Sequence, residues 1–128
     1  MPITLAIDSG KRIVYSALHG AVDDEQIARH IQLIKSHPNF QPAFADIIDC
    51  QGVTEASVAE STLRDLASRQ SIFSTEAMHI VIAPKGHLAR LAEMYKAAAE
   101  STRPNFQIVR TPEEAYEYLR QRRGDRQG

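Results

Sequence analysis

The sequence predicts an α/β fold in which a mainly parallel sheet has helices on both faces. Residues 78–83 form a nearly continuous apolar run that Pro84 ends, which is typical of a strand buried on both faces. A helical pattern from Gly86, a short apolar run at residues 106–110 and a helix that begins with Pro112 follow. Because strands and helices alternate with short joints, we expect these consecutive strands to run parallel.

The first segment predicts a β-hairpin. Ile3, Leu5 and Ile7 alternate with more polar residues, turn residues occupy positions 8–11, and a second strand pattern covers residues 13–18. Two strands joined by so short a turn run antiparallel. We therefore expect the first strand at the edge of the sheet.

The next segment predicts a helix with Asp23 as its N-cap and its end before Pro38. Asp23 and Gln26 have the spacing of a capping box, which satisfies free backbone N–H groups at a helix start. A third strand is expected at residues 44–50, closed by the Gln-Gly pair at residues 51–52. The buried face of the helix is expected to consist of Ile27, Ile31 and Ile34.

The second helix has two alternative starts. Residues 57–60, Ser-Val-Ala-Glu, have a capping-box pattern that predicts a cap at Ser57, while Thr54 is an alternative cap one turn earlier. The apolar stripe of this helix is expected to consist of Leu63, Leu66, Ala67 and Phe73.

Two further helices flank the last strand, which is expected at residues 106–110. Thr111 precedes Pro112, and proline is favoured at the first position of a helix. The predicted order is thus β-β-α-β-α-β-α-β-α, a five-strand mixed sheet in one domain over residues 1–119. Residues 120–128 contain four arginines and one aspartate, and we expect a basic flexible tail there. The packing face of the third helix is expected to consist of Leu88, Leu91, Ala92, Tyr95 and Ala99.

Composition excludes several classes of partner. The 128 residues suffice for one domain, and 15 basic against 16 acidic side chains give a net charge of −1, so nucleic acid is not an expected partner. The single Cys50 forms no internal disulfide, the start lacks a signal-peptide pattern, and no apolar run approaches the roughly 20 residues of a membrane span. We expect a soluble, cytoplasmic protein without stable membrane insertion.

Candidate site residues follow from the topology, because ligands of parallel sheets bind beyond the carboxyl ends of the strands. Lys85, Gly86, His87 and Arg90 are the most suggestive cluster, since two cations and a histidine accompany the free N–H groups of a helix start and predict an anion site. In the alternative interpretation Gly86 is a tight joint and Arg90 pairs with Glu93. The other residues at this edge are His19, Gly20, Cys50, Gln51, Thr54, Ser57, Arg110 and Thr111.

Catalysis and metal binding have little support. Cys50 with His87 and Asp49 permits a Cys–His nucleophile, but Asp49 and Cys50 point to opposite faces of one strand. His79 lies within an apolar strand and is interpreted as a hydrogen-bonded core or semi-buried residue. The five histidines have no metal-ligand spacing. We expect neither a metal nor a cofactor.

Several short segments together resemble one known family. The chain is similar to the SpoIIAA-like family, which is related to bacterial anti-sigma-factor antagonist (STAS) domains and to the CRAL-TRIO lipid-transfer fold. The segments that carry the resemblance are residues 14–18 with Gly20, residues 37–40, Asp49 with residues 52–53, Gly86 with Ala89, Arg90 and Glu93, residues 106–110, residues 114–115 and residues 118–119.

The resemblance implies a non-catalytic regulatory or binding module, because STAS domains switch protein partners and CRAL-TRIO relatives hold lipids. A protein that holds a small apolar or lipid ligand between the sheet and a mobile helix is the alternative, and an enzyme that uses Cys50 and His87 is a third. In phosphoregulated STAS domains the switch serine follows an aspartate, and the corresponding residues here are Ala56 and Ser57. Ser57 is thus a regulatory candidate or only a helix cap. The oligomeric state, including a homodimer, stays open.

Overall fold

The computed structural model describes residues 3–127 of the chain. Their elements follow the predicted order, and the sheet has the five strands that the sequence predicts. The elements are β1 (Ile3–Asp8), β2 (Ile13–Asp23), α1 (Asp24–Ser36), β3 (Ala45–Ser57), α2 (Glu60–Ser68), β4 (His79–Ile82), α3 (His87–Ala98), β5 (Phe106–Val109) and α4 (Pro112–Gln127).

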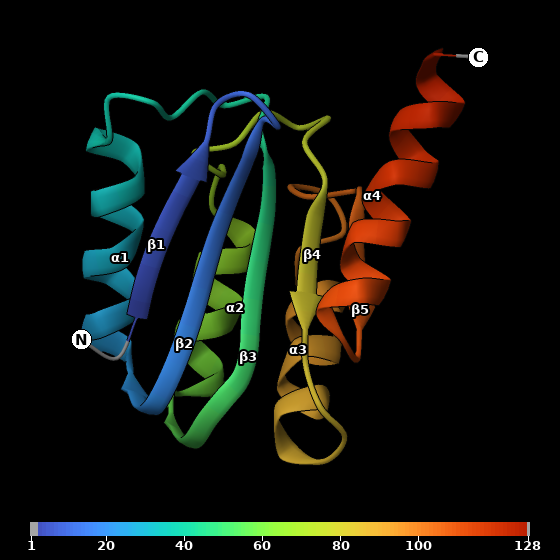
Figure 1. The fold of residues 1–128 in the computed structure, drawn as a ribbon. Helices are drawn as coiled ribbons and strands as arrows, with labels where there is room; N and C mark the ends of the chain where they lie inside the picture. The colour runs from blue at the N-terminus through green and yellow to red at the C-terminus, as the bar shows by residue number, and fades with distance from the viewer. Residues whose placement is uncertain (1–2, 128) are drawn as a thin grey trace.

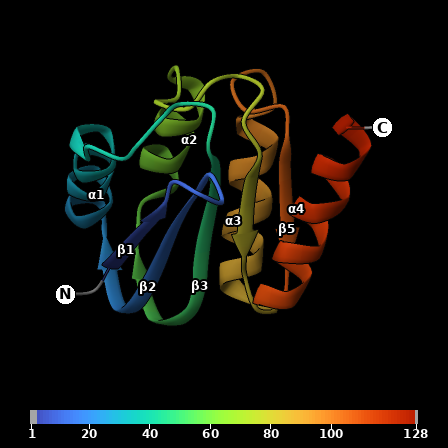
Figure 2. The same ribbon diagram turned by 45° about the horizontal axis from the view of Figure 1, so that its top comes forward.

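The strands lie side by side in chain order, from β1 at one edge to β5 at the other (Figure 1). β1 pairs antiparallel with β2, and all later neighbours are parallel. The predicted α/β class, the mixed sheet and the antiparallel edge strand are therefore confirmed. Because every right-handed crossover advances in the same direction, α1, α2 and α3 lie on one face of the sheet, and α4 alone lies on the other (Figures 1 and 2).

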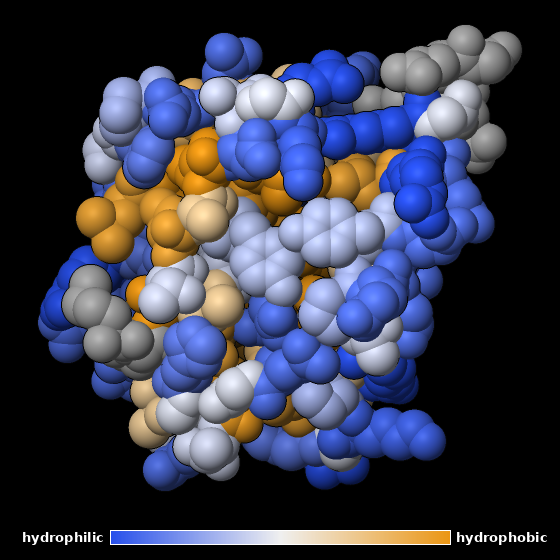
Figure 3. Space-filling view, in the orientation of Figure 1, coloured by the Kyte–Doolittle hydropathy of each residue, from blue (hydrophilic) through white to orange (hydrophobic). Residues whose placement is uncertain are grey.

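The face under α4 holds the largest buried cluster. Alternate residues of the central strands point to this side, and Ala115 and Leu119 of α4 pack on them. Nearby, the Tyr15 ring stacks on the Tyr116 ring with 6.4 Å between ring centres, and the Tyr15 hydroxyl donates a 2.6 Å hydrogen bond to Asp49. Burial and this bond raise the pKa of Tyr15. Figure 3 shows this side of the molecule, where hydrophobic side chains form a band across the upper part and hydrophilic ones predominate below.

The strands β2 and β3 are longer than predicted. The expected end of the third strand at residues 51–52 is wrong, because β3 continues through Ser57 and pairs with the far half of β2, with shifts in register. Gly52 allows this approach: a Cβ there would lie 2.8 Å from His19 Nδ1 and 3.0 Å from the Leu18 carbonyl oxygen. This glycine therefore marks close contact between two strands rather than a chain reversal.

The predicted cap of α1 is correct, and the predicted cap of α2 is wrong. Asp23 and Gln26 form the expected capping box at α1, with both hydrogen bonds at 2.9 Å. Neither Ser57 nor Thr54 caps α2, because both lie within β3 and α2 begins at Glu60.

Asp24, the first residue of α1, binds the start of α2 instead. Its carboxylate accepts hydrogen bonds from the Ala59 N–H at 3.1 Å and the Thr62 hydroxyl at 2.8 Å. Phe73 lies beyond the end of α2 at Ser68, so its expected place on that helix is also wrong. It packs instead in the cluster that includes Val14 and Ile34.

The last helix passes the predicted domain boundary at residue 119 and continues through Gln127. Arg123 donates hydrogen bonds to the carbonyl oxygens of Lys11 at 2.6 Å and Arg12 at 2.8 Å, which join this segment to the β1–β2 turn. The expected tail is therefore helical from Arg120 to Gln127, and its flexibility stays a prediction. Among the helices of residues 3–127, none has the length and apolar character needed to cross a membrane.

Candidate functional site

A pocket of about 340 Å³ lies between the sheet and helices α1, α2 and α3. Ligand pockets in proteins typically have volumes of about 300 to 1,000 Å³ and are lined mainly by apolar side chains. Most of the residues around this pocket are apolar, and β2, β3, β4, α1, α2 and α3 all contribute. Representative lining residues are Leu18, Ile31, Ile48, Leu63, Val81 and Leu91.

The alternation of side chains along the strands brings a polar residue to this face from each of three strands. Successive residues of a strand point to opposite faces, so Ser16 accompanies Leu18 on β2 and Asp46 accompanies Ile48 on β3. His79 accompanies Val81 on β4 in the same way. Ser16, Asp46 and His79 are the buried polar residues of the described chain, and all three line the pocket.

Asp46 and His79 form a buried pair. The two residues are register partners at the beginnings of β3 and β4, and His79 Nδ1 lies 3.1 Å from Asp46 Oδ2. The His79 ring contacts Phe73 edge-on at 5.2 Å and stacks on Phe106 at 6.2 Å between ring centres. The prediction that His79 is a hydrogen-bonded core residue is confirmed.

The other ring nitrogen of His79 makes no hydrogen bond. Among the buried side-chain nitrogen and oxygen atoms of the described residues, Nε2 of His79 is the one without a partner. A buried polar atom left unpaired costs about 1 to 3 kcal/mol of stability. Such an atom in a pocket wall is a feature that a bound polar group would satisfy.

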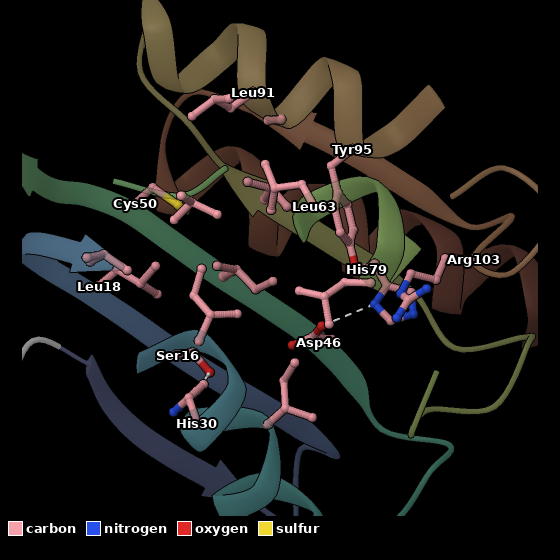
Figure 4. Close-up of a pocket in the computed structure, with 18 of the residues that line it drawn as sticks. Ser16, Leu18, His30, Asp46, Cys50, Leu63, His79, Leu91, Tyr95 and Arg103 are labelled. Carbon is pink, nitrogen blue, oxygen red and sulfur yellow. Dashed lines mark hydrogen bonds and ion pairs between the residues drawn. The ribbon is translucent and has the colours of Figure 1, made fainter. Parts of the chain in front are cut away.

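Tyr95 and Arg103 complete this end of the pocket. The Tyr95 side chain extends from α3 toward His79, and Arg103 lies beside them (Figure 4). The Arg103 guanidinium carbon is 5.6 Å from the centre of the Tyr95 ring, which is a cation–π geometry. Arg103 Nη1 donates to the carbonyl oxygens of Ala67 and Arg69, both at 3.3 Å, and so holds the end of α2. Burial raises the pKa of Tyr95, with Arg103 acting in the opposite direction.

A second histidine lies further along the pocket. His30 Nε2 of α1 is 2.7 Å from the Ser16 hydroxyl oxygen, and both residues line the pocket (Figure 4). Burial lowers the pKa of His30, although the Asp46 charge opposes this shift. Because its protonation is disfavoured, His30 adds a neutral imidazole to the wall rather than a cation.

The opposite end of the pocket is apolar and contains Cys50. Leu18 and Leu91 lie toward this end in the close-up, and Leu63 lies between Cys50 and Tyr95 (Figure 4). Burial raises the pKa of the Cys50 thiol to about 12, with a smaller contribution from the charge of Asp49. A thiol with such a pKa is almost entirely protonated at neutral pH, and the thiolate is the nucleophilic form.

The other parts of the expected Cys–His nucleophile lie apart. The Asp49 side chain binds Tyr15 on the α4 side of the sheet, so Asp49 and Cys50 do point to opposite faces, as predicted. His87 is exposed at the start of α3 and does not line the pocket. Within residues 3–127, no hydrogen bond joins Cys50 and His87. Within the same residues, no group of three His, Cys, Asp or Glu side chains could hold a metal ion.

The predicted anion cluster lies outside the pocket. Lys85, Gly86, His87 and Arg90 are all exposed at the start of α3. Gly86 is the N-cap and has a φ of 105°, so its role as a tight joint is confirmed. The alternative Arg90–Glu93 ion pair does not form in the described part of the chain. Anion binding at these four residues stays a prediction.

Sequence reasoning missed the polar end of the pocket because it searched the carboxyl ends of the strands. Asp46 and His79 lie at the opposite ends of the strands, within the first two residues of β3 and β4. The available signal was the rarity of charged or titratable residues inside apolar strands. That signal marked His79 as unusual, but 33 residues separate it from Asp46 in the chain.

Comparison with known proteins does not assign the chain to a class. A scan against models of protein families finds no match, and a search of curated proteins finds no significant match. The fold and pocket therefore define an α/β protein with an amphipathic pocket, and its function must be argued from that geometry.

Proposed function

We propose that this protein is a non-catalytic binding module for a small apolar or lipid ligand, held between the sheet and helices α1 to α3. The observation that carries the proposal is the pocket of about 340 Å³, which is lined mainly by apolar side chains. Burial of apolar ligand surface there contributes about 25 cal/mol per Å² before the costs of association. The raised pKa of Cys50 supports a binding role over a thiol enzyme.

This proposal reverses the order of the alternatives that the SpoIIAA-like resemblance suggests. The resemblance places protein partners first and a lipid ligand second, whereas the pocket favours the ligand. Membership of the SpoIIAA-like family, with its STAS-like sandwich, remains part of the proposal. The order of strands and helices and the antiparallel edge pair support it.

A thermal-shift experiment with matched variants tests ligand binding. Saturated fatty acids, fatty alcohols and phospholipids are added to the wild-type protein and to two Leu→Trp variants. Leu91→Trp adds bulk to a residue that lines the pocket, whereas Leu33→Trp makes the same change at a side chain of α1 that is 48% exposed and lies outside the pocket.

We expect ligands to raise the melting temperature of the wild type and of Leu33→Trp by several degrees. A ligand present at about 100 times its Kd stabilises a protein by about 2.7 kcal/mol. Leu91→Trp should lose most of this shift because the indole occupies the ligand volume. If no ligand shifts the melting temperature of the wild type, the proposed function is wrong.

A protein partner is the second candidate, and the exposure of Ser57 favours it. Ser57 is the last residue of β3 and is accessible next to the start of α2. Phosphorylation there adds about two negative charges to that surface. Ser57→Asp should weaken the binding of a purified partner, while Ser57→Ala should leave that binding unchanged. Equal binding by both variants would remove Ser57 from consideration.

A further inference from the structure

The pocket is polar at one end and apolar at the other. Asp46, His79, Tyr95 and Arg103 come together at the first end, and the leucine side chains around Cys50 form the second (Figure 4). A ligand that fills such a pocket places its polar group at the first end. The chemistry of that group follows from the polar atom of the pocket wall that has no hydrogen-bond partner.

The Asp46–His79 hydrogen bond determines what His79 can offer. An ionised carboxylate only accepts hydrogen bonds, so the proton of this bond belongs to Nδ1 of His79. In the neutral ring, Nε2 is then a bare acceptor, and it has no partner in the described structure. In this neutral form Nε2 therefore needs a hydrogen-bond donor.

We propose that the pocket takes an apolar molecule with a terminal hydroxyl group, and that this hydroxyl donates a hydrogen bond to Nε2 of His79. The inference rests on the proposed function and specifies the chemical class of its ligand. A long-chain alcohol has the required parts, because its chain matches the apolar end and its hydroxyl supplies the donor.

The charges near His79 favour a hydroxyl over a carboxylate. A ligand carboxylate cannot donate to Nε2 and would bring a second negative charge close to Asp46. Arg103 is a cation at this end, and because its Nη1 donates to Ala67, Arg69 and Thr102, a carboxylate would have to approach Nη2 or Nε instead. His30, another titratable residue of the pocket, has its pKa lowered by burial and adds no positive charge.

Access to Nε2 requires a local movement, because the atom is buried in the structure. Tyr95 is only partly buried and extends toward His79 from α3, so it is the neighbour best placed to rotate (Figure 4). We expect the ring signals of Tyr95 to shift when the ligand binds.

Three ligands of equal chain length test the proposal: decanol, decyl methyl ether and decanoate. Decanol supplies a donor, the ether only an acceptor, and decanoate a charge. Calorimetric titration of the wild-type protein should give a Kd for decanol roughly three- to tenfold lower than that for the ether, the contribution of one net hydrogen bond.

Two double variants show where the preference arises. Asp46→Leu with His79→Phe replaces both partners by apolar groups, and it should bind the ether but lose the preference for decanol. Ser16→Ala with His30→Leu removes the other polar pair of the same pocket and should keep the preference. If the first variant does not fold, the ¹⁵N shift of His79 Nε2 in the wild type replaces it, since decanol should move this signal and the ether should not.

The outcomes separate this inference from the proposed function. If none of the three ligands binds, the proposed function fails. If decanol and the ether bind equally well, the hydroxyl assignment is overturned while the apolar pocket stands. A Kd for decanoate below that for decanol would overturn it in favour of an acidic ligand.

Discussion

Asp46 and His79 are neighbours across two parallel strands, with Oδ2 and Nδ1 3.1 Å apart inside the wall of the pocket. The two residues are 7% and 3% exposed, so water contributes little to solvating either of them. Their hydrogen bond compensates for the burial of both groups, and it leaves one nitrogen of His79 for a ligand. A single contact thus links the stability of the sheet to the chemistry of the pocket.

The first prediction concerns the stability of this pair. Asp46→Leu or His79→Phe alone should lower the free energy of unfolding by about 1 to 3 kcal/mol, because each leaves its partner buried without a hydrogen bond. The double variant should cost less than the sum of the two. Urea unfolding of all four proteins gives the coupling energy. Strictly additive losses would contradict a direct interaction.

The second prediction concerns the link between α1 and α2. Asp24→Ala should lower the free energy of unfolding by about 1 to 2 kcal/mol, because the Ala59 N–H and the Thr62 hydroxyl lose their acceptor. Urea unfolding measures this loss. Hydrogen exchange should also accelerate at the start of α2, although the substitution lies in α1.

Ser57→Ala is the control for the Asp24 variant. Since Ser57 lies in β3 and caps no helix, its replacement should change stability by less than about 0.5 kcal/mol. If Ser57→Ala lost as much stability as Asp24→Ala, the result would support Ser57 as the helix cap that the sequence predicts.

The third prediction concerns Cys50. With its pKa raised to about 12, the thiol should react with iodoacetamide far more slowly in the folded protein at pH about 8 than in urea. Mass spectrometry follows the alkylation. The pKa of the thiol is higher in the folded state, so the protonated thiol contributes to the free energy of unfolding. This contribution is fully present below the ordinary pKa of 9.0 and is lost as the pH rises toward 12. Rapid alkylation of the folded protein would contradict the burial of the thiol.

The fourth prediction concerns Gly86, which has a φ of 105° at the start of α3. Gly86→Ala should cost about 1 to 3 kcal/mol, because residues with a Cβ rarely adopt this conformation even where space is available. Gly124→Ala is the matched control within α4, where alanine favours the helix and should be neutral or stabilising. Thermal unfolding of both variants measures the difference, and equal effects would contradict a conformational role for Gly86.

The sequence by itself determined the features that depend on neighbouring residues. Pro84 ends a strand, Pro112 begins a helix and Asp23 caps α1, because each acts on backbone groups only a few residues away. The continuous apolar run around β4 likewise predicted a strand covered on both faces, and His79 stood out within it. These local signals were enough for the fold class and the element order.

Only the tertiary structure decided the contacts between distant residues. The carboxylate that binds the start of α2 belongs to Asp24, which lies 35 residues before Ala59, so no local pattern at Ser57 or Thr54 could reveal it. Gly52 permits an approach to His19 of the neighbouring strand, and the position of that strand is set by register. The polar end of the pocket likewise depends on which residues of β3 and β4 face each other. Sequence periodicity determines the face on which a side chain lies, but packing and register determine its neighbours.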